Sequence, residues 1–512
     1  MIQKLLIANR GEIAVRIIHA ARELGIRTVA ITSEADQSAL HASLADEVVN
    51  LEGNAPEQTY LNIPKILRVA HETSADAIHP GYGFLSERAV FAKACIESGF
   101  IFVGPPPEAM EMLGAKIESK KRATGLGIPV VPGFYEENVS SEKLFEESKK
   151  IGFPVMLKAS AGGGGRGMRI VPSEEEFTYL LRHASEEAQK SFGDGTMMVE
   201  KLIQKPRHIE VQVIADAKGN VWSLFERECS LQRRHQKIIE ESPAPYFIHT
   251  EKKPISSLWP AMQNAAIELV KSVGYQNAGT VEFIIDETTD QFFFLEVNTR
   301  LQVEHPVTEF ITGVDLVQMQ LLIASGLSLE EIPFQVPKNK EEIHTHAIEA
   351  RIVAEDPANE FLPSSGKIAG WLLPSLPGVR IDTGFEQDSV ISPIYDSLLA
   401  KVIVHAPNRP LAIAKLKQAL ENFHVLGIKT NISYLLDVIV NEAFLTGKYD
   451  THFLEREFRS WKEPSEIPDS VWSIYQYLNK KRYSQAQELG RSQNADFSVW
   501  DSDDGWSNVH TK

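Results

Sequence analysis

The chain has 512 residues, of which 43% are hydrophobic and 24% are charged, a composition typical of a globular enzyme with two to four packed units. Its formal net charge of −17 argues against a nucleic acid or an anionic membrane as the main partner, because both need cationic surfaces. Two cysteines are too few for a disulfide framework, so we expect a reducing compartment, by default the cytoplasm.

The N-terminus and the hydropathy pattern indicate no targeting or membrane segment. The opening MIQKLLIANRG has only the apolar run LLIA before Asn9 and Arg10, which is too short for a signal peptide. No stretch approaches the roughly 20 apolar residues of a membrane span. We therefore expect a soluble cytoplasmic protein that has neither a membrane nor a nucleic acid as its partner.

Residues 1–112 alternate short apolar runs with helical patterns, which predicts a doubly wound α/β unit with a parallel sheet. The strand-like runs are KLLIAN, RTVAITS, DAIHPG and FIFVGP, and the first helical pattern is EIAVRIIHAARELG, which ends at Gly25. The first turn, ANRGEIAVR, lacks the second and third glycines of a dinucleotide-binding loop, so we do not expect NAD here.

Two further units and a polar tail follow. From 113 to 335, strands joined by turns such as ADAKGN and DETTD favour an antiparallel sheet and an α+β unit. Residues 336–446 contain HAIEARIVAED and end in the helical pattern RPLAIAKLKQALENF. The stretch 459–512 is polar yet holds four of the seven tryptophans.

Within this tail, helical spacing relates Val471, Ile474, Tyr475 and Leu478. The composition fits a partly disordered tail. The spacing and the tryptophans fit equally well a short amphipathic helix that docks on the body of the protein or on a partner. Both interpretations stay open.

The segment KASAGGGGRGMRI, Lys158 to Ile170, places a lysine before four consecutive glycines. A Walker loop would need the lysine after the glycines and a helix beyond it, whereas MRIV is strand-like. We expect a hairpin tip, Gly162 to Gly167, whose backbone N–H groups fold over a phosphate that Lys158 also reaches. A hairpin that is merely mobile would have the same run of glycines.

Glu282 and Glu296 lie at nearly equal distances from the turn in TVEFIID-ETTD-QFFFLEVNTR. On adjacent antiparallel strands their side chains should meet on one face, where like charges destabilise the sheet unless a cation lies between them. Mg²⁺ suits one or two carboxylates with phosphate oxygens and water, and Asn298 offers a third oxygen. The hairpin therefore predicts a magnesium site.

Polar residues continue at period two along and beyond this strand, in Glu296, Asn298, Arg300, Gln302 and Glu304. If the run is extended, they form one polar row, which fits either a solvent-facing strand or the wall of a cleft. The flanking FFFL and HPVTEF are apolar, so we favour a cleft in which ligands or partners satisfy the row.

The segment QRRHQK, Gln232 to Lys237, is a second cluster of interest because it is basic in an acidic chain. It contains Arg233, Arg234, His235 and Lys237, and so is a candidate site for an anion. A solvated charged loop is the alternative, and such runs commonly are solvated.

Nine segments in consistent order show that the chain resembles biotin carboxylase, the ATP-grasp component of biotin-dependent carboxylases. They are NRGEIAVRII, HPGYGFLSE, KASAGGGGRGMRIV, PRHIEVQV, QRRHQKIIEESPAP, GTVEF, FLEVNTRLQVEHPVTE, EARIVAEDP and YDSLLAKVIV. The resemblance implies a Rossmann-like N-terminal domain (1–112), an ATP-grasp domain (113–335) with a glycine-rich lid at about 131–203, and a C-terminal biotin carboxylase domain (336–446). It gives no role to the extension 459–512.

The resemblance also implies which residues hold the nucleotide and the metal ion. The residues matching the ATP site are Lys116, Lys158, Gly163, Gly164, Gly165, Gly167, Glu200, Lys201, Ile203, His208, Gln232 and His235. Glu282, Glu296 and Asn298 match the Mg²⁺ (or Mn²⁺) positions, in agreement with the hairpin argument. Ala115 stands where the family commonly has Asp, which leaves the environment of Lys116 open.

For the chemistry, the resemblance implies that Glu304 is the base that deprotonates bicarbonate. The residues matching bicarbonate or carboxyphosphate contacts are Arg300, Gln302, the Val303 N–H and Lys237. Carboxyphosphate would yield CO₂ and phosphate, and phosphate would remove the biotin N1 proton. Arg351 would stabilise the biotin enolate, and Tyr82 would lie near the biotin.

The partners implied are bicarbonate, a biotin carboxyl carrier protein and a carboxyltransferase subunit. No Met-Lys-Met biotinylation motif occurs, so we expect biotin to arrive on another chain. We expect the first half-reaction of an enzyme such as acetyl-CoA carboxylase, in fatty acid biosynthesis, with propionyl-CoA, methylcrotonyl-CoA and pyruvate carboxylases as alternatives. Family members often form homodimers, which we expect here.

Two other classes of function are weighed against this one. An ATP-grasp ligase that joins a carboxylate to an amine would share the metal pair and the lid, whereas QRRHQK, RLQVEHPVTE and EARIVAEDP favour bicarbonate and biotin. A non-catalytic ATP-binding scaffold is expected to have lost Glu304, Lys237 or Arg351, and all three are present. ATPase activity stimulated by bicarbonate and free biotin would separate the first alternative.

Overall fold

The computed structural model describes residues 1–136, 139–160, 167–248 and 253–463, with 472–473, 475–477 and 480. The chain divides into a compact unit, Met1–Lys462, and a second unit, Glu463–Lys512. Of the predicted tail helix, Val471, Ile474 and Leu478 lie outside the described residues, while the ring of Tyr475 packs edge-on against Trp472 with centroids 6.1 Å apart.

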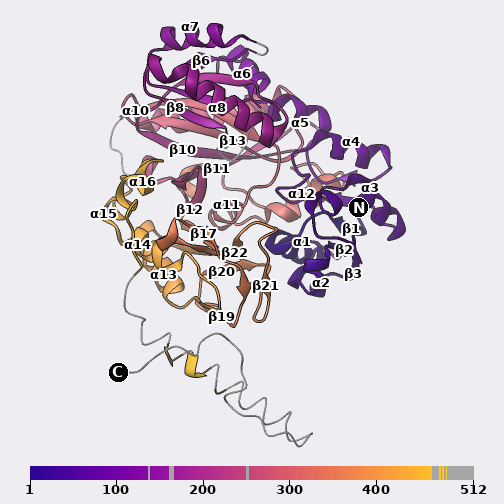
Figure 1. Cartoon of the computed structure of the whole chain (residues 1–512). Helices are drawn as coiled ribbons and strands as arrows, with labels where there is room; N and C mark the ends of the chain where they lie inside the picture. The colour runs from indigo at the N-terminus through magenta and orange to yellow at the C-terminus, as the bar shows by residue number, and fades with distance from the viewer. Residues whose placement is uncertain are drawn as a thin grey trace, which may run out of the picture. The chain divides into compact units, whose positions relative to one another are not determined.

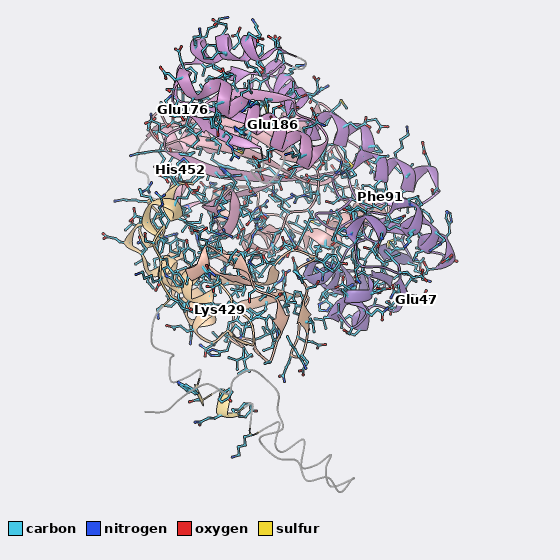
Figure 2. All side chains as sticks on the ribbon, in the orientation of Figure 1. Glu47, Phe91, Glu176, Glu186, Lys429 and His452 are labelled. Carbon is cyan, nitrogen blue, oxygen red and sulfur yellow. The ribbon has the colours of Figure 1, made fainter. Side chains whose placement is uncertain are left out.

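The N-terminal part of the larger unit contains a parallel five-stranded sheet in the order β3-β2-β1-β4-β5, as the alternating pattern predicts. Strands β1, β2 and β3 are labelled in Figure 1. Its strands are short, mostly buried apolar runs: β1 (Lys4–Ile7), β2 (Arg27–Thr32), β3 (Glu47–Asn50), β4 (Ala77–His79) and β5 (Ile101–Phe102). The helices are α1 (Gly11–Glu23), α2 (Leu40–Leu44), α3 (Ile63–Glu72), α4 (Ala89–Glu97) and α5 (Pro107–Gly114), with 3₁₀ turns at Glu34–Asp36 and Pro56–Gln58. Phe91 on α4, labelled in Figure 2, is fully buried in the core of this part.

A small α/β layer follows, built on a four-stranded sheet in the order β6-β9-β7-β8. Its elements are α6 (Lys116–Gly125), β6 (Gly133–Phe134), α7 (Ser141–Ile151), β7 (Val155–Ala159), β8 (Met168–Val171), α8 (Glu174–Phe192) and β9 (Met197–Lys201). Strands β7 and β8 pair antiparallel with Lys158 opposite Met168, so the glycine segment joins the two strands of a hairpin, as predicted. Glu176 and Glu186, labelled in Figure 2, lie on the exposed face of α8.

The largest sheet has eight strands in the order β14-β13-β10-β11-β12-β15-β22-β20, and every pair in it is antiparallel. The strands are β10 (Pro206–Ala215), β11 (Val221–Arg233), β12 (Gln236–Ser242), β13 (Asn277–Asp286), β14 (Gln291–Asn298), β15 (His346–Val353), β20 (Val379–Thr383) and β22 (Leu398–Ala406). Because β12 pairs with β15, this sheet runs without a break across the predicted domain boundary at 335/336. Those domain limits remain predictions.

Helices pack on the apolar face of this sheet, and polar side chains occupy the other face. On β10, Ile209, Val211 and Val213 belong to the hydrophobic core, which α10 (Lys253–Lys271) shares. Alternation at period two then places His208, Glu210 and Gln212 on the opposite face. On the C-terminal strands the core is closed by α13 (Arg409–Glu421) and α14 (Ile432–Val440).

The remaining elements connect these layers. They are α9 (Pro245–Ile248), α11 (His305–Thr312), α12 (Leu316–Ala324), α15 (Glu442–Leu445) and α16 (Phe453–Glu457), the short strands β16 (Glu355–Asp356), β17 (Leu362–Pro363), β18 (Gly366–Lys367), β19 (Gly370–Leu372), β21 (Val390–Ile391) and β23 (His424–Leu426), and 3₁₀ turns at Lys340–Glu342 and Pro357–Asn359. Helices α14 to α16 extend the C-terminal part beyond the helix that the sequence predicts at its end.

The length and hydropathy of the helices in the described residues bear on whether any could cross a membrane. No single helix there is both long and apolar enough to cross a membrane. The pair α11 and α12 passes by length and composition only when taken together, and the two helices are bent by 93° at their junction. Nearly all residues of both helices are buried in the protein.

Candidate active site

A cavity of about 720 Å³ lies between the N-terminal part, the four-stranded layer and the polar face of the large sheet. It brings together predicted residues of every class, namely Tyr82, Lys116, Lys158, Glu200, Lys201, Ile203, His208, Gln232, His235, Lys237, Glu282, Glu296, Asn298, Arg300, Gln302, Val303, Glu304 and Arg351. Gly163, Gly164 and Gly165 lie outside the described residues. Gly167 is described, and its φ of +72° together with a Cβ position 2.9 Å from Ala159 Cβ explains why a glycine stands there.

The predicted carboxylate hairpin forms with the expected register. Glu282 on β13 lies directly opposite Glu296 on β14, and a bulge follows between Glu282 and Phe283. Asn298 Nδ2 donates to Glu282 Oε1 at 2.6 Å, and Gln302 Nε2 donates to the same oxygen at 2.8 Å. One Glu282 oxygen thus accepts from two side-chain amides, and the paired Glu296 carries a second carboxylate into the same cavity wall. Carboxylate oxygens are ligands that a hard divalent cation prefers.

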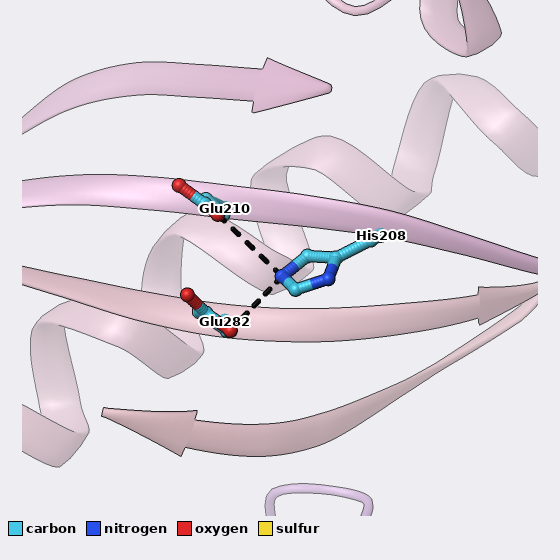
Figure 3. Close-up of side chains that lie close together, drawn as sticks. All are labelled: His208, Glu210 and Glu282. Atoms are coloured by element: carbon cyan, nitrogen blue, oxygen red, sulfur yellow. Dashed lines mark ion pairs between the residues drawn. The ribbon is translucent and has the colours of Figure 1, made fainter. Parts of the chain in front are cut away.

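A third carboxylate that the sequence analysis did not select joins this group. Glu210 on β10 lies opposite Glu282, and His208 stands beside both (Figure 3). His208 Nε2 lies 3.0 Å from Glu282 Oε2 and 3.5 Å from Glu210 Oε1. The three side chains are buried and their ligand atoms lie close enough to share one metal ion. The period-two run PRHIEVQV holds the signal, because it places His208 and Glu210 on one face.

Lys237 supplies the positive charge at the centre of these carboxylates. Its Nζ lies 2.7 Å from Glu304 Oε1 and 3.0 Å from Glu282 Oε1, and it also contacts Glu210. Burial alone would lower the pKa of Lys237, but the surrounding carboxylates raise it well above the ordinary value. The basic segment is therefore not a solvated loop at this residue, since Lys237 is 13% exposed and paired.

Glu304 immediately precedes α11 and ends the predicted polar row. The row is not one continuous strand, because β14 stops at Asn298 and Pro306 lies in the first turn of the following helix, yet all five side chains line the same cavity. Arg351 Nη2 donates to Glu304 Oε2 at 2.9 Å. Burial would raise the pKa of Glu304, but Lys237, Arg351 and Arg227 hold it well below the ordinary value. Glu304 is therefore ionised, which is the state that a general base requires.

Arg227 is another buried group that the sequence analysis missed. It is fully buried on β11 and donates to Glu210 Oε2 at 3.0 Å and to Gln302 Oε1 at 2.8 Å. Arg227 thereby connects Glu210 to Gln302, which lines the cavity. Its signal in the sequence is weak, because FERE presents charges on both faces of a strand.

At the other end of the cavity, lysines pair with carboxylates. Lys158 Nζ lies 2.5 Å and Lys120 Nζ 2.8 Å from the Glu200 carboxylate, while Lys116 Nζ lies 3.5 Å from Glu296 Oε2. Burial would raise the pKa of Glu200, but the two lysines lower it far below the ordinary value. Glu200 is therefore an ionised hydrogen-bond acceptor in a part of the wall that also includes the apolar side chains of Met156 and Met198.

The remaining predicted residues are held by specific contacts. Gln232 Nε2 donates to His208 Nδ1 at 2.8 Å, and burial lowers the pKa of His235 at the β11–β12 turn. Arg300 Nε lies 3.0 Å from Glu87 Oε2, and Arg300 Nη2 donates to Asn298 Oδ1 at 3.3 Å. The backbone oxygen of Tyr82 accepts from Asn9 Nδ2 at 2.8 Å, which fixes the loop that carries this ring.

Three family models match the chain. The model for the biotin carboxylase N-terminal domain matches residues 1–110, that for the carbamoyl-phosphate synthase L chain ATP-binding domain matches 115–332, and that for the biotin carboxylase C-terminal domain matches 349–456. These three segments contain every residue that lines the polar wall described above.

Curated relatives include the mitochondrial methylcrotonoyl-CoA carboxylase subunit alpha of Oryza sativa subsp. japonica, which is 48% identical over 456 residues, and the mitochondrial pyruvate carboxylase of Homo sapiens, 47% identical over 456 residues. Each alignment covers 89% of this chain. The chain spans 60% of the first relative and 38% of the second.

Among solved structures, the biotin carboxylase domain of Hydrogenobacter thermophilus 2-oxoglutarate carboxylase superposes with a TM-score of 0.85 at 43% identity, over 91% of this chain and 100% of that one. It is a dimer in complex with MgADP, ADP and bicarbonate. Biotin carboxylase from Campylobacter jejuni, in a β-γ-ATP complex, gives a TM-score of 0.83 at 43% identity, over 89% and 99% of the two chains.

Proposed function

We propose, since this chain belongs to the biotin carboxylase family of ATP-dependent ligases, that it uses ATP, Mg²⁺ (or Mn²⁺) and bicarbonate to carboxylate biotin. One observation carries the proposal. The cavity holds a carboxylate hairpin suited to a divalent cation next to Glu304, a buried ionised carboxylate fixed between Lys237 and Arg351. Phosphate activation and proton removal can therefore take place in one enclosed space.

The proposed metal ligands are Glu282, Glu296 and Asn298, with Glu210 and His208 beside them. Their oxygens fit Mg²⁺ because it binds one or two carboxylates together with phosphate oxygens and water. A divalent cation held there would neutralise charge on the phosphoryl group during transfer. Removing these negative groups is expected to weaken metal binding rather than folding.

For the nucleotide, we propose that Lys116 and Lys158 turn from their carboxylates to the phosphate oxygens, with Gly163, Gly164, Gly165 and Gly167 as the lid loop. Adenine would lie against Glu200, Lys201 and Ile203. The ribose would be contacted by His208, Gln232 and His235. All of the non-glycine residues in these three groups line the cavity, which supports the assignment.

In the proposed reaction Glu304 takes the proton of bicarbonate, and the resulting oxyanion attacks the γ-phosphorus of ATP. The new P–O bond forms as the bond to ADP breaks, giving carboxyphosphate. The C–O bond of carboxyphosphate then breaks to give CO₂ and phosphate, and phosphate takes the N1 proton of biotin as N1 bonds to CO₂. Positioning and charge neutralisation supply most of the rate enhancement in such transfers.

The remaining side chains of the wall would position these reactants. We propose that Arg300, Gln302, the Val303 N–H and Lys237 contact bicarbonate and carboxyphosphate. Arg351 would stabilise the enolate oxygen of biotin, and Tyr82 would lie near its ring. Arg300 and Arg351 each already contact a carboxylate of the wall, so they can exchange that partner for an anionic reactant.

The test is a measurement of ADP release by the purified chain with ATP, Mg²⁺, bicarbonate and free biotin. We expect turnover that depends on both bicarbonate and biotin. ADP release that ignores bicarbonate but requires an amine would reject the proposal in favour of a carboxylate–amine ligase. Absence of turnover combined with tight ATP binding would favour a scaffold.

For the complete carboxylase to which this chain would contribute, we propose only a class of enzyme. The curated relatives act on methylcrotonoyl-CoA or pyruvate, so a carboxylase of either type is at least as strong a candidate as acetyl-CoA carboxylase. A biotin carboxyl carrier and a carboxyltransferase are the proposed partners. Purified native complex tested with acetyl-CoA, propionyl-CoA, methylcrotonyl-CoA and pyruvate would identify the acceptor.

Compartment and assembly are also proposals. The cytoplasm is proposed from the two cysteines, both of which are free and buried, whereas the curated relatives named above are mitochondrial. A homodimer is proposed because the Hydrogenobacter domain is a dimer. Cell fractionation and the mass of the purified chain in solution test the two statements separately.

A further inference from the structure

Two buried glutamates face each other behind the proposed base, and the function proposed above gives them no role. Glu240 on β12 lies directly opposite Glu349 on β15, and neither residue is exposed to solvent. Residues directly opposite in an antiparallel pair project to the same face with Cβ atoms about 4.5–5.5 Å apart. Two carboxyl groups are therefore neighbours inside the sheet.

One guanidinium connects this pair to Glu304. Arg351 Nε donates to Glu240 Oε1 at 2.6 Å, and Arg351 Nη2 donates to Glu304 Oε2 at 2.9 Å. Within the described part of the chain, Glu240 Oε2 and both carboxylate oxygens of Glu349 have no hydrogen-bond partner. Two ionised carboxylates in that position would be costly, whereas a shared proton supplies the missing donor.

The charged groups that face the pair do not neutralise it. Lys237, on β12, is occupied by Glu210, Glu282 and Glu304. Lys401, on β22, lies 3.3 Å from Glu12 and 3.4 Å from Asp382, and donates to Val303 O at 3.0 Å. Lys401 also opposes the negative charge of Glu349, and Arg351 opposes that of Glu240. Each cation is shared with other carboxylates, Lys401 with Glu12 and Asp382 and Arg351 with Glu304, so negative charge is in excess.

Protonation of the pair agrees with this charge count. Burial raises the pKa of Glu240 to about 7, against the opposing effect of Arg351 and with the help of Glu304. Burial also raises the pKa of Glu349 well above its ordinary value, and Glu240 adds to the shift. In contrast, Lys237 and Arg351 outweigh burial and hold the pKa of Glu304 well below its ordinary value, so a proton is bound more weakly on Glu304 than on the pair.

We infer that Glu240 and Glu349 share one proton and that this carboxyl pair accepts the proton that Glu304 removes from bicarbonate. The inference rests on the proposed function and deepens it. The O–H bond of Glu304 breaks and an O–H bond forms on Glu240, with no other change in bonding. When Arg351 turns to biotin, Glu304 and Glu240 lose the donor between them, and a direct hydrogen bond or one bridging water connects them.

The shared proton is tested without turnover. Infrared difference spectra of the full chain, recorded as the pH is lowered through about 7, should show a carbonyl band of protonated carboxyl that weakens in Glu240→Gln and in Glu349→Gln. Glu228→Gln is the matched control, because burial also raises the pKa of Glu228 to about 7 while its neighbours are Arg207 and Ser230 rather than Glu304. Spectra of the Glu240 and Glu349 variants that match wild type would overturn the inference.

The proton transfer is tested by kinetics. We expect the wild-type kcat for bicarbonate-dependent ADP release to fall as pH drops through about 7, because a doubly protonated pair accepts no proton. Glu240→Gln should lower kcat at pH 8 by roughly 10- to 100-fold and remove this acidic limb, with the KM for ATP unchanged. Glu349→Gln should move the pH at which kcat falls on the acidic side. Glu228→Gln should leave that pH unchanged.

A wild-type kcat and acidic limb in Glu240→Gln, or a loss confined to the KM for biotin, would reject the transfer, since the second result means that Glu240 only positions Arg351. If Glu240→Gln does not fold, Glu349→Gln decides. Absence of bicarbonate-dependent turnover in the wild type would instead reject the proposed function, while the infrared result would still stand by itself.

Discussion

Glu240 and Glu241 are neighbours on β12, both are fully buried, and their side chains lie on opposite faces of the large sheet. Glu241 accepts from Arg409 Nε at 2.7 Å and Nη2 at 2.9 Å and from Tyr449 OH at 2.5 Å, and His346 Nε2 lies 2.7 Å away. Glu240 has only Arg351, and one of its oxygens has no partner in the described part of the chain.

The difference separates a carboxylate that supports the fold from one that is available for chemistry. Burial would raise the pKa of both groups. Arg409 and His346 hold the pKa of Glu241 far below its ordinary value, whereas burial raises the pKa of Glu240 to about 7. A fully satisfied carboxylate cannot change its protonation state cheaply, so it fixes the packing of α13 against the sheet. An undersatisfied carboxylate can exchange a proton.

The largest loss of activity is expected at Glu304, on the face of the large sheet that lines the cavity. Glu304→Gln should lower bicarbonate-dependent ADP release by about 10³-fold or more, because an amide cannot take the proton, and ATP binding should persist. Steady-state kinetics and equilibrium nucleotide titration measure the two quantities. Unaltered turnover would remove Glu304 from the role of base.

On the opposite face, Arg409→Met should lower the free energy of unfolding by about 3 kcal/mol, because it leaves Glu241 buried and without its cation. Denaturant unfolding measures this, and turnover per folded molecule is the control that should stay near wild type. A loss below about 1 kcal/mol would show that His346 and Tyr449 suffice for Glu241.

The carboxylate hairpin is expected to respond through the metal ion. Glu296→Gln should raise the Mg²⁺ concentration needed for half-maximal activity by about tenfold or more, since one anionic ligand is lost. Its partner Lys116 stays in place, so the thermal midpoint should change little. A Mg²⁺ titration curve identical to that of wild type would refute the hairpin as the metal site.

The smallest effect concerns how stability depends on pH. The folded-state pKa of Glu240 lies above its unfolded value, so its contribution is present at low pH and is lost as pH rises through about 7. Glu240→Gln should therefore remove a loss of about 1 kcal/mol in unfolding free energy between pH 6 and pH 8. Unfolding in denaturant at both pH values measures it.

Glu241 should show the reverse dependence. Its folded-state pKa is depressed, so its contribution is present above its unfolded pKa and is lost as pH falls below that value. Glu241→Gln should flatten the acid side of the stability curve and leave the neutral side unchanged. If both variants changed the pH dependence of the unfolding free energy in the same direction, the distinction between the two faces of the sheet would be contradicted.

Local patterns predicted the features that depend on neighbouring strands. Equal spacing from a turn was enough to place Glu282 opposite Glu296, and the strand-like flanks of the glycine run were enough to predict a hairpin. The parallel N-terminal sheet followed from the alternation of strands and helices. In each case the structure follows from periodicity within a few dozen residues.

Features that depend on distant segments were not predicted. Glu241 contacts Arg409, 168 residues away, and β12 pairs with β15 across a predicted domain boundary, and no local period encodes either pairing. The sequence placed Lys237 in a candidate anion site or a solvated loop. It could not show the carboxylates of Glu210, Glu282 and Glu304 around Lys237, because they come together only in the folded sheet.

The contacts of Lys116 with Glu296 and of Lys158 with Glu200 imply that a nucleotide triphosphate and a divalent cation each increase the affinity of the cavity for the other. A triphosphate that draws Lys116 away leaves Glu296 more negative, which improves the binding of a divalent cation, and the cation in turn frees Lys116 for phosphate. Thermodynamic linkage makes the gain equal in both directions. Nucleotide without metal, or metal without nucleotide, must break an ion pair and receives no such compensation, so the pocket favours the complex of the two over either alone.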